Sequence, residues 1–275
     1  AAGPMLDRRE LEDLRHRDRE REGGERDINS FQPQGSQAEQ EAGAEVGGRM
    51  TGFPNLDPLL RPRSIAVVGA STRPSPGLAM LKSLERLGFD GRIFPVNPKY
   101  AEVGGHACFA SLKDLPEAPD LVLFCTSAAA ILEQLRAAAE RGARAAVIYD
   151  GGFAERGEAG ARLQAELAQL CAEAGIVLCG PNCMGIVSPH DRATSFLQEL
   201  RDPEGLARNV GFISHSGSIC SGMLTDLRRY GFSYAISCGN EAVVTLADYI
   251  DNLIDDPATR VIGLFIECVR QPERF

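Results

Sequence analysis

Two turns contain the residues best suited to bind phosphate. The first is Gly69-Ala-Ser-Thr-Arg-Pro-Ser-Pro-Gly77, which directly follows the apolar run Ile65–Val68. The second is Ser214-His-Ser-Gly-Ser218, which directly follows Val210–Ile213. A buried strand that leads into such a turn and then a helix directs backbone N–H groups and a helix N-terminus at an anion. Together with Gly180-Pro-Asn-Cys-Met-Gly185 between them, the turns predict a protein that handles two phosphate-bearing groups in two adjacent α/β units.

The first turn differs from the fingerprint of a dinucleotide-binding enzyme. Gly-x-Gly-x-x-Gly would require glycine where the chain has Ser71 and Pro74, and the strand Arg92–Val96 is followed by Asn-Pro-Lys99 without an acidic residue. A lysine there offers a cation to a phosphate, whereas an NAD enzyme offers a carboxylate to the ribose. The sequence therefore argues against hydride transfer; a turn retained only for packing is the remaining alternative.

An acidic residue, Glu267, ends the apolar run Val261–Ile266. A carboxylate at the end of a buried parallel strand seldom serves packing alone. Glu267 is therefore a candidate functional residue of the second unit.

Short apolar runs alternate with helical patterns through the first unit. Strands separated by single helices predict right-handed crossovers and a Rossmann-like, doubly wound parallel sheet. Ligands of such sheets bind outside the carboxyl ends of the strands. The segments are Ile65–Val68, Leu78–Leu87, Arg92–Val96, Leu121–Cys125, Ala128–Arg141, Ala145–Tyr149, Ala159–Ala174 and Val177–Cys179.

The chain divides into four predicted parts. Residues 1–49 are rich in Arg, Glu, Gln and Gly, and we expect a disordered or non-native leader, with Met50 as the natural start. Residues 50–188 form the Rossmann-like domain, 189–209 a linker, and 210–275 the N-terminal part of a second α/β domain. Its predicted elements are strands 210–213, 234–237 and 261–266 and helices 218–230 and 246–253. Three parallel strands make a poor independent domain, so this unit looks truncated.

Composition excludes several classes of protein. The formal net charge of −9 argues against a nucleic-acid surface, which needs clustered cations. No run approaches the ~20 apolar residues of a membrane span and no secretory signal is present, so we expect a cytoplasmic protein that does not enter membranes. Eight cysteines without a Cys-x-x-Cys pair are interpreted as reduced thiols, with neither metal nor disulfide.

Five motifs resemble one family, the NDP-forming acyl-CoA synthetases, relatives of the succinyl-CoA synthetase α-subunit. The resemblance covers about residues 57–275 and implies a CoA-binding domain followed by a flavodoxin-like ligase domain. The motifs are Leu59-Leu-Arg-Pro-Arg-Ser-Ile-Ala-Val-Val-Gly-Ala-Ser71, Pro95-Val-Asn-Pro-Lys99, Gly180-Pro-Asn-Cys-Met-Gly185, Ile213-Ser-His-Ser-Gly217 and Ser237-Cys-Gly-Asn240.

The resemblance implies a role for individual residues. Lys99 would pair with a CoA phosphate, Asn182 would position the pantetheine arm or the acyl group, and Glu267 would orient a phosphohistidine. The helix that begins at Ser216, Gly217 and Ser218 would direct its dipole at the same phosphohistidine. The CoA nucleotide would lie on Gly69, Ala70, Ser71, Thr72 and Arg73, and the cofactor path would be lined by Thr126, Ser127, Tyr149 and Asp150.

The phosphoryl-accepting histidine of the family is missing, because no histidine follows His215. His215 lies in the wrong loop to replace it, where relatives more often carry glutamine or arginine, and a turn-packing or anion-contacting role is expected. The ATP-grasp region is also missing. We therefore expect the chain to bind CoA without turnover, and the complete enzyme to use a carboxylate, ATP and Mg with an ATP-grasp domain or β-type subunit. A homo-oligomer is a further possibility, because the truncated unit would expose apolar surface.

Two other functions compete with the synthetase. A CoA-sensing regulatory module, such as one associated with a protein acyltransferase, would keep the first turn and Lys99 but need neither Glu267 nor the helix start at Ser216. An NAD-linked oxidoreductase would need the ribose-binding carboxylate that the first unit lacks. The residues present favour the synthetase.

Overall fold

The computed structural model describes residues 53–200, 203, 205–225 and 231–275. The predicted leader over residues 1–49 lies outside the described residues, and so do residues 226–230 of the predicted helix 218–230. Within the described part of the chain, no helix is long and apolar enough to cross a membrane.

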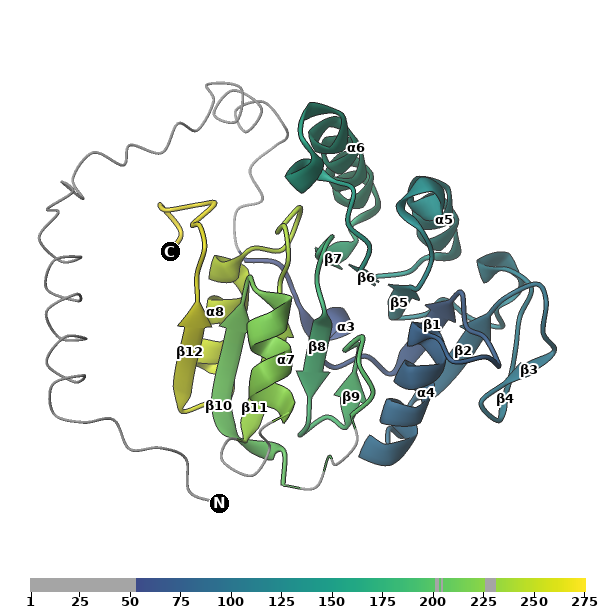
Figure 1. Cartoon of the computed structure of the whole chain (residues 1–275), viewed down its shortest axis with the longest axis horizontal. Coiled ribbons are helices and arrows are strands. Elements are labelled where there is room, and N and C mark those ends of the chain that lie inside the picture. Colours follow the sequence, from purple (N-terminus) through teal and green to yellow (C-terminus); the bar gives the residue numbers. More distant parts are fainter. Residues whose placement is uncertain (1–52, 201–202, 204, 226–230) are drawn as a thin grey trace, which may run out of the picture. The chain divides into compact units, whose positions relative to one another are not determined.

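The first sheet has five parallel strands in the order β2-β1-β5-β6-β7 (Figure 1). Because the strands on the two sides of β1 are reached in opposite directions along the sheet, the order is that of a doubly wound fold. The predicted Rossmann-like class is therefore confirmed. The strands are β1 (Ser64–Val68), β2 (Arg92–Val96), β5 (Leu121–Phe124), β6 (Ala145–Ile148) and β7 (Val177–Cys179).

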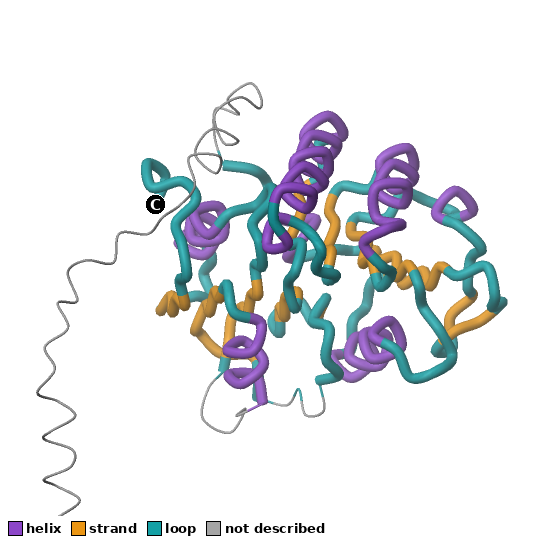
Figure 2. Tube along the Cα trace, turned by 45° about the horizontal axis from the view of Figure 1, so that its top comes forward, coloured by secondary structure: helices purple, strands orange, loops and turns teal. Residues whose placement is uncertain are grey.

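Helices cover both faces of this sheet (Figure 2). Ile65 and Val67 of β1 pack in a cluster with residues of α4, whereas Ala66 and Val68 pack with residues of α5 and α6. Alternate strand residues point to opposite faces, so all five positions of β1 are buried. The helices are α4 (Pro76–Leu87), α5 (Ala128–Arg141) and α6 (Glu158–Ala174). Smaller elements are α3 (Asp57–Leu60), β3 (Glu102–Val103), β4 (His106–Ala107), η2 (Leu112–Asp114) and η3 (Ala154–Arg156).

The second sheet also has five strands, in the order β12-β10-β11-β8-β9. The strands β10, β11 and β12 are parallel, as predicted, but β8 pairs antiparallel with β11 and β9 antiparallel with β8. The elements are β8 (Gly185–Ser188), β9 (Ala193–Thr194), β10 (Ala207–Ser214), α7 (Gly217–Thr225), β11 (Phe232–Ser237), α8 (Leu246–Asp255) and β12 (Val261–Phe265).

The second sheet reaches further back in the sequence than its predicted start at residue 210. Residues 185–188, assigned to the first domain, form β8, and the predicted linker contains β9 and the beginning of β10. The physical reason is that β8 occupies the backbone hydrogen-bonding edge of β11, which three parallel strands alone would leave open. The domain boundaries themselves stay predictions.

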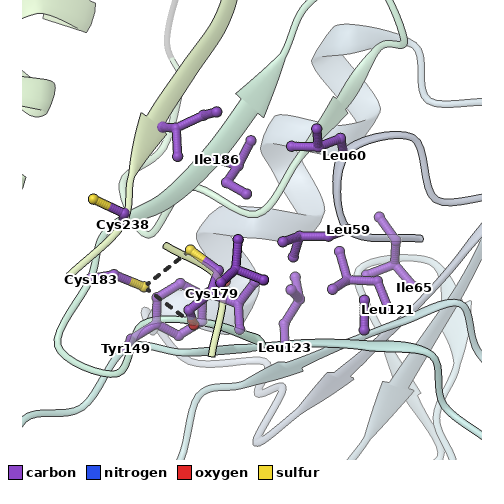
Figure 3. Packing of buried hydrophobic residues seen from close by; sticks show 14 of the residues in the cluster. Leu59, Leu60, Ile65, Leu121, Leu123, Tyr149, Cys179, Cys183, Ile186 and Cys238 are labelled. Atoms are coloured by element: carbon purple, nitrogen blue, oxygen red, sulfur yellow. Dashed lines mark hydrogen bonds between the residues drawn. The ribbon is translucent and has the colours of Figure 1, made fainter. Parts of the chain in front are cut away.

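One apolar cluster joins the two sheets (Figure 3). It runs from the α4 face of the first sheet, through Tyr149 and Cys183, to Ile186 and Cys238 of the second. The Sγ atoms of Cys179 and Cys183 lie 3.9 Å apart within it. Burial raises the pKa of the cluster's Cys183 thiol well above its usual range, so it packs as a neutral apolar group.

Replacing Tyr149 with phenylalanine tests how firmly this cluster holds the sheets together. The Tyr149 hydroxyl donates a 2.6 Å hydrogen bond to the carbonyl oxygen of Ser195, and both residues are buried. Tyr149→Phe removes the donor from a buried carbonyl, so we expect the free energy of unfolding to fall by about 1–3 kcal/mol. Urea denaturation measures the change.

The matched control is Tyr100→Phe, because Tyr100 is only half-buried and its hydroxyl lies 3.3 Å from the Oγ of the part-buried Ser71. This variant should change stability by less than about 0.5 kcal/mol. Equal midpoints for the two variants would mean that the Tyr149 hydrogen bond does not contribute.

Candidate functional site

A cavity of about 460 Å³ opens at the carboxyl ends of β1, β2 and β5. This is where the strand order reverses, and doubly wound sheets bind ligands at that point. Lysines and small polar residues contribute to its lining beside apolar ones. The lining residues are Val68, Gly69, Val96, Asn97, Pro98, Lys99, Ala110, Ser111, Leu112, Lys113, Thr126, Glu133, Gln134 and Ala137.

Gly69 lets the chain turn sharply at the end of β1. Its φ is +86°, and a Cβ atom added to it would lie 2.7 Å from the carbonyl oxygen of Cys125. Its N–H donates to the carbonyl oxygen of Val96 at 2.9 Å. A larger residue would have to push the ends of β1 and β5 apart, so Gly69 keeps the cavity floor in shape.

Asn97 connects the two turns that border the cavity. Its Nδ2 donates to the carbonyl oxygen of Ala70 at 2.7 Å, and its Oδ1 accepts from the backbone N–H of Lys99 at 3.0 Å. The exposed Lys99 is thereby held beside the turn that follows Gly69. Asn97 could not be found from the sequence, because a side chain that bonds two loops has no local pattern.

Two cationic side chains, Arg73 and Lys99, act on Tyr100 beside the turn after β1. The Tyr100 hydroxyl lies 3.3 Å from Ser71 Oγ. Hydrogen bonding to Ser71 and Thr72, and then the charges of Arg73 and Lys99, lower the pKa of this phenol. The same field would favour an anion. Tyr100 is thus a second site residue that sequence reasoning missed.

Helix α4 begins two residues before its predicted start at Leu78. Its first residue is Pro76, which has no N–H, and the side chain of Ser75 already accepts from the N–H of Leu78 at 3.3 Å. The loop amides of Ala70, Ser71 and Thr72 are further N–H donors close to the cavity, whereas the N–H of Arg73 already donates to Ser71 Oγ at 3.0 Å. That the N-terminus of this helix faces a phosphate stays a prediction.

The residues that follow β5 and β6 have different surroundings. Thr126 lines the cavity, and its hydroxyl donates to Gln134 Oε1 at 2.5 Å. Asp150 lies at the start of α5, where its carboxylate accepts from the N–H of Ala128 at 2.6 Å. A carboxylate at that position stabilises the helix through its dipole and uses an amide that an anion would otherwise meet. Ser127 is the N-cap residue of α5 and lies outside the cavity lining.

Tyr149 does not behave as predicted for a residue that lines the cofactor path. Its side chain points into the shared cluster (Figure 3). Its hydroxyl donates to the carbonyl oxygen of Ser195. Burial raises the pKa of this phenol well above its usual value. The side chain therefore serves the packing between the sheets.

Asn182 belongs to a second polar group, between the turn after β7 and the loop after β11. It has a φ of +57° after the cis peptide bond Gly180–Pro181. Its Nδ2 donates to Asn240 Oδ1 at 3.2 Å, and Asn240 Nδ2 donates to Glu155 Oε2 at 2.6 Å and to Gln164 Oε1 at 3.1 Å. Asn240 thus fixes the Asn182 side chain from the other sheet, and Glu155 fixes Asn240.

The second predicted phosphate site lies at the end of β10. Ser216 Oγ accepts from the N–H of Ile219 at 3.4 Å, and α7 begins at Gly217 with Ser218 next. A Cβ on Gly217 would lie 2.6 Å from Met184 Cγ, so glycine allows this helix to begin close to the turn after β7. Glu267 follows β12, its side chain is exposed, and its backbone N–H donates to His215 Nδ1 at 2.9 Å.

The structure therefore separates the predicted residues into three groups. Gly69, Lys99 and Thr126 meet at the cavity, with Ala70, Ser71, Thr72 and Arg73 in the adjoining loop. Asn182 lies in the Asn240 group, and Ser216, Gly217, Ser218 and Glu267 lie around the end of β10.

A larger cavity, of about 680 Å³, lies at the opposite edge of the first sheet, around Ser64 and Arg92. Its charged side chains are largely paired with one another. Arg92 Nε lies 2.6 Å from Glu117 Oε1, and Arg144 contacts Asp120 at 3.3 Å. Because these cations are neutralised and the amino ends of strands are not the ligand-binding edge, we do not assign it a ligand.

Comparisons with known proteins match both parts of the chain. Residues 63–189 match the family model of a CoA binding domain, and residues 207–275 match that of a succinyl-CoA ligase-like flavodoxin domain.

Relatives extend the match across most of the chain. A trans-feruloyl-CoA synthase from an unknown prokaryotic organism is 37% identical over 84% of the chain and 33% of its own length. The α subunit of the ADP-forming acetate–CoA ligase II of Pyrococcus furiosus is 34% identical over 80% of the chain and 48% of its own length. The chain thus spans between a third and a half of these curated relatives.

A solved structure is similar as well. The dinucleotide-forming acetyl-coenzyme A synthetase 1 of Ca. Korarchaeum cryptofilum, in complex with phosphate and ADP, has a TM-score of 0.75 and 29% identity. The alignment covers 80% of this chain and 48% of that protein.

Substitution of Glu155 tests the Asn240 group through its pH dependence. Burial acts to raise the pKa of the Glu155 carboxyl, but hydrogen bonds from Asn240 and from the amides of Gly152 and Phe153 outweigh it, and the pKa lies below its ordinary 4.5. The ionised form therefore stabilises the fold above that pH, and the stabilisation is lost as the pH falls through the folded-state pKa.

We expect Glu155→Gln to lower the free energy of unfolding at pH 7 by no more than about 1 kcal/mol, since the side chain is exposed. The difference in free energy of unfolding between this variant and the unsubstituted chain should shrink as the pH is lowered below 4.5, the ordinary pKa of a glutamate carboxyl. Urea midpoints at several pH values measure this. Glu85→Gln, at an exposed position of α4, is the control; a pH-independent deficit for Glu155→Gln would contradict the network.

Proposed function

Because this chain belongs to the NDP-forming acyl-CoA synthetase family and contains its CoA-binding portion, we propose that the complete protein joins a carboxylic acid to CoA. The overall reaction is carboxylate, CoA and ATP to acyl-CoA, ADP and phosphate. In this proposal ATP phosphorylates a histidine outside residues 1–275, and the phosphoryl group passes to the carboxylate. The CoA thiol then displaces phosphate from the acyl phosphate.

The single observation that carries the proposal is the cavity beside Gly69 and Lys99. It lies at the strand reversal of the domain that matches the CoA-binding model. Its exposed lysine and the amides of the adjoining loop are donors suited to the phosphates of CoA. Such a site binds phosphate through local donors and does not require a positive net charge of the protein. It is therefore compatible with the formal net charge of −9.

We assign the parts of CoA to the groups described above. The phosphates contact Lys99, Arg73 and the amides of Ser71 and Thr72, and the pantetheine arm passes Thr126. The thiol end then points toward Asn182, which Asn240 and Glu155 hold in place. Two neighbouring donor sets thus serve the two ends of one extended ligand.

The start of α7 is proposed as the phosphoryl site. Gly217 and Ser218 provide amides at a helix N-terminus, where the dipole favours an anion. Glu267 is proposed to orient the phosphohistidine. Preorganised donors at a site of developing charge are the usual means by which acyl and phosphoryl transfers are accelerated.

Partners are proposed on two grounds. ATP and Mg would bind to an ATP-grasp domain or β-type subunit, and one relative is itself named a subunit α. Apolar side chains on and after β12, among them Leu264, Phe265 and Ile266, are more than a third exposed. Such a surface suits burial against further protein, whether that subunit or a second copy.

The relatives favour the synthetase over the alternatives. Their names are those of CoA ligases or synthases for feruloyl, acetate and 4-hydroxybutyrate groups. We therefore propose a carboxylic acid of unassigned side chain as substrate. The regulatory module gains no support from these names, and the cytoplasmic location stays a prediction.

Calorimetric titration of CoA into the purified chain tests the proposal. We expect selective binding of CoA over NAD and ATP. Lys99→Ala should weaken it by about tenfold, since a charge-assisted contact to phosphate is lost, and the loss should diminish at high salt.

Lys82→Ala, at an exposed position of α4 outside the cavity lining, is the matched control and should leave the affinity unchanged. A preference for NAD, or equal losses for the two lysine variants, would contradict the assignment of the cavity to CoA.

A further inference from the structure

Three buried side chains behind the second phosphate site are not used by the proposed function. They are His215, Cys238 and Glu241, and one ligand-type atom of each lies within 4.8 Å of the others. The side chains of His215 and Glu241 are only 5% and 1% exposed. A buried imidazole facing a buried carboxylate requires a physical reason, because such groups are costly to remove from water.

His215 bonds to the segment that carries Glu267. Its backbone N–H donates to the carbonyl oxygen of Phe265 at 3.1 Å, and its Nδ1 accepts from the backbone N–H of Glu267 at 2.9 Å. The ladder between β10 and β12 ends at the pair Ser214 and Phe265. The imidazole therefore holds the main chain of Glu267 beyond the last ladder pair, where backbone pairing has stopped.

The carboxylate of Glu241 holds the other side of the ring. Its Oε1 lies 3.1 Å from His215 Nε2 and accepts from the N–H of Leu246, the first residue of α8, at 2.6 Å. The His215 Nε2–H is not well aligned with this oxygen, so the contact is electrostatic rather than a linear hydrogen bond. Nδ1 accepts a hydrogen bond from the backbone N–H of Glu267 and therefore carries no proton, so a neutral ring has its proton on Nε2, facing Glu241.

The same geometry argues against a metal ion in the cluster. A metal on Nε2 would require the proton of a neutral ring to sit on Nδ1, directly opposed to the N–H of Glu267. Cys238 Sγ lies at hydrogen-bonding distance, 3.3 Å, from the carbonyl oxygen of Ser214, and burial raises the pKa of this thiol. His215 Nε2 and Cys238 Sγ are therefore both protonated, whereas a metal ion needs deprotonated ligand atoms.

The ring is also poorly placed to accept a phosphoryl group. One nitrogen is occupied by the amide of Glu267, the other faces the carboxylate of Glu241, and the side chain is buried. This agrees with the expectation that His215 does not replace the missing phosphoryl-accepting histidine.

We propose that His215 and Glu241 are positioning residues that fix the main chain of Glu267 beside the start of α7. The hydrogen-bond path runs from the N-terminus of α8, through Glu241 and the His215 ring, to the amide of Glu267. The consequence for phosphoryl transfer rests on the function proposed above for Glu267, whereas the path itself does not.

Nuclear magnetic resonance of the full 275-residue chain tests the path directly. Long-range proton–nitrogen spectra should show a neutral His215 ring protonated on Nε2. In His215→Phe, hydrogen exchange of the Glu267 amide should accelerate by about 3- to 10-fold, the value of one lost hydrogen bond. His215→Asn places a carbonyl oxygen near the Nδ1 position and should restore protection.

The backbone amide of residue 215 is the internal control, because its bond to Phe265 does not involve the ring. It should exchange alike in all three proteins, and joint acceleration of both amides would mean general loosening and overturn the proposal. Glu241→Gln should shift part of the ring to the Nδ1-protonated form, because it removes the charge that faces Nε2. If the position of the ring proton is unchanged in Glu241→Gln, the role of Glu241 is overturned. If the ring signals of His215 shift on addition of Zn²⁺, the cluster is a metal site and the proposal is overturned.

Activity of the complete synthetase separates this inference from the proposed function. Histidine phosphorylation from radiolabelled ATP should fall by about 10- to 100-fold in His215→Phe, with CoA affinity unchanged. Glu267→Gln should show a similar loss, and the double variant no further one. If the Glu267 amide exchanges faster in His215→Phe but Glu267→Gln leaves histidine phosphorylation unchanged, the function proposed for Glu267 is refuted and the hydrogen-bond path stands. If the Glu267 amide exchanges at the same rate in His215→Phe, the path is refuted whatever the activity.

Discussion

The reversal of strand order beside β1 is the constraint on which the proposed CoA site depends. All five strands of the first sheet are parallel, so their carboxyl ends share one edge. The connection after β1 runs through α4 to β2, and the connection after β5 runs through α5 to β6 in the opposite direction along the sheet. The point between β1 and β5 is therefore the one that such folds leave open to a ligand. Gly69 closes this point to within van der Waals distance of Cys125, and the cavity forms above it.

A shared interior makes the two sheets one mechanical unit. The cluster around Tyr149 and Cys183 includes side chains from both sheets. The turn 180–182 is also bonded to the loop after β11, through Asn240 N–H to the carbonyl of Pro181 at 2.9 Å and Ala242 N–H to that of Gly180 at 3.0 Å. A close-packed interior is hardly compressible, so neither sheet can shift without moving the other. The Asn182 group therefore keeps a fixed position relative to the first sheet.

The second sheet depends on polar contacts beyond its ladders. β12 is an edge strand with exposed apolar residues, and the segment after it has little packing of its own. The path from Glu241 through His215 gives this segment a defined position close to the start of α7. A buried polar path of this kind is stabilising only when each donor meets an acceptor. This requirement limits the segment to one geometry.

The sequence by itself determined the alternation of strands and helices that builds the first sheet, the parallel class of that sheet and the residues of both turns. Those features follow from local periodicity and from glycine, proline and capping residues, which act within a few positions. Only the tertiary structure decided that β8 joins the second sheet, that Tyr149 points inward, and that Asn97, Asn240 and Glu241 each reach a residue of another loop. These outcomes depend on how strands distant in the sequence align, and the side-chain hydrogen bonds that result have no periodic signal along the chain.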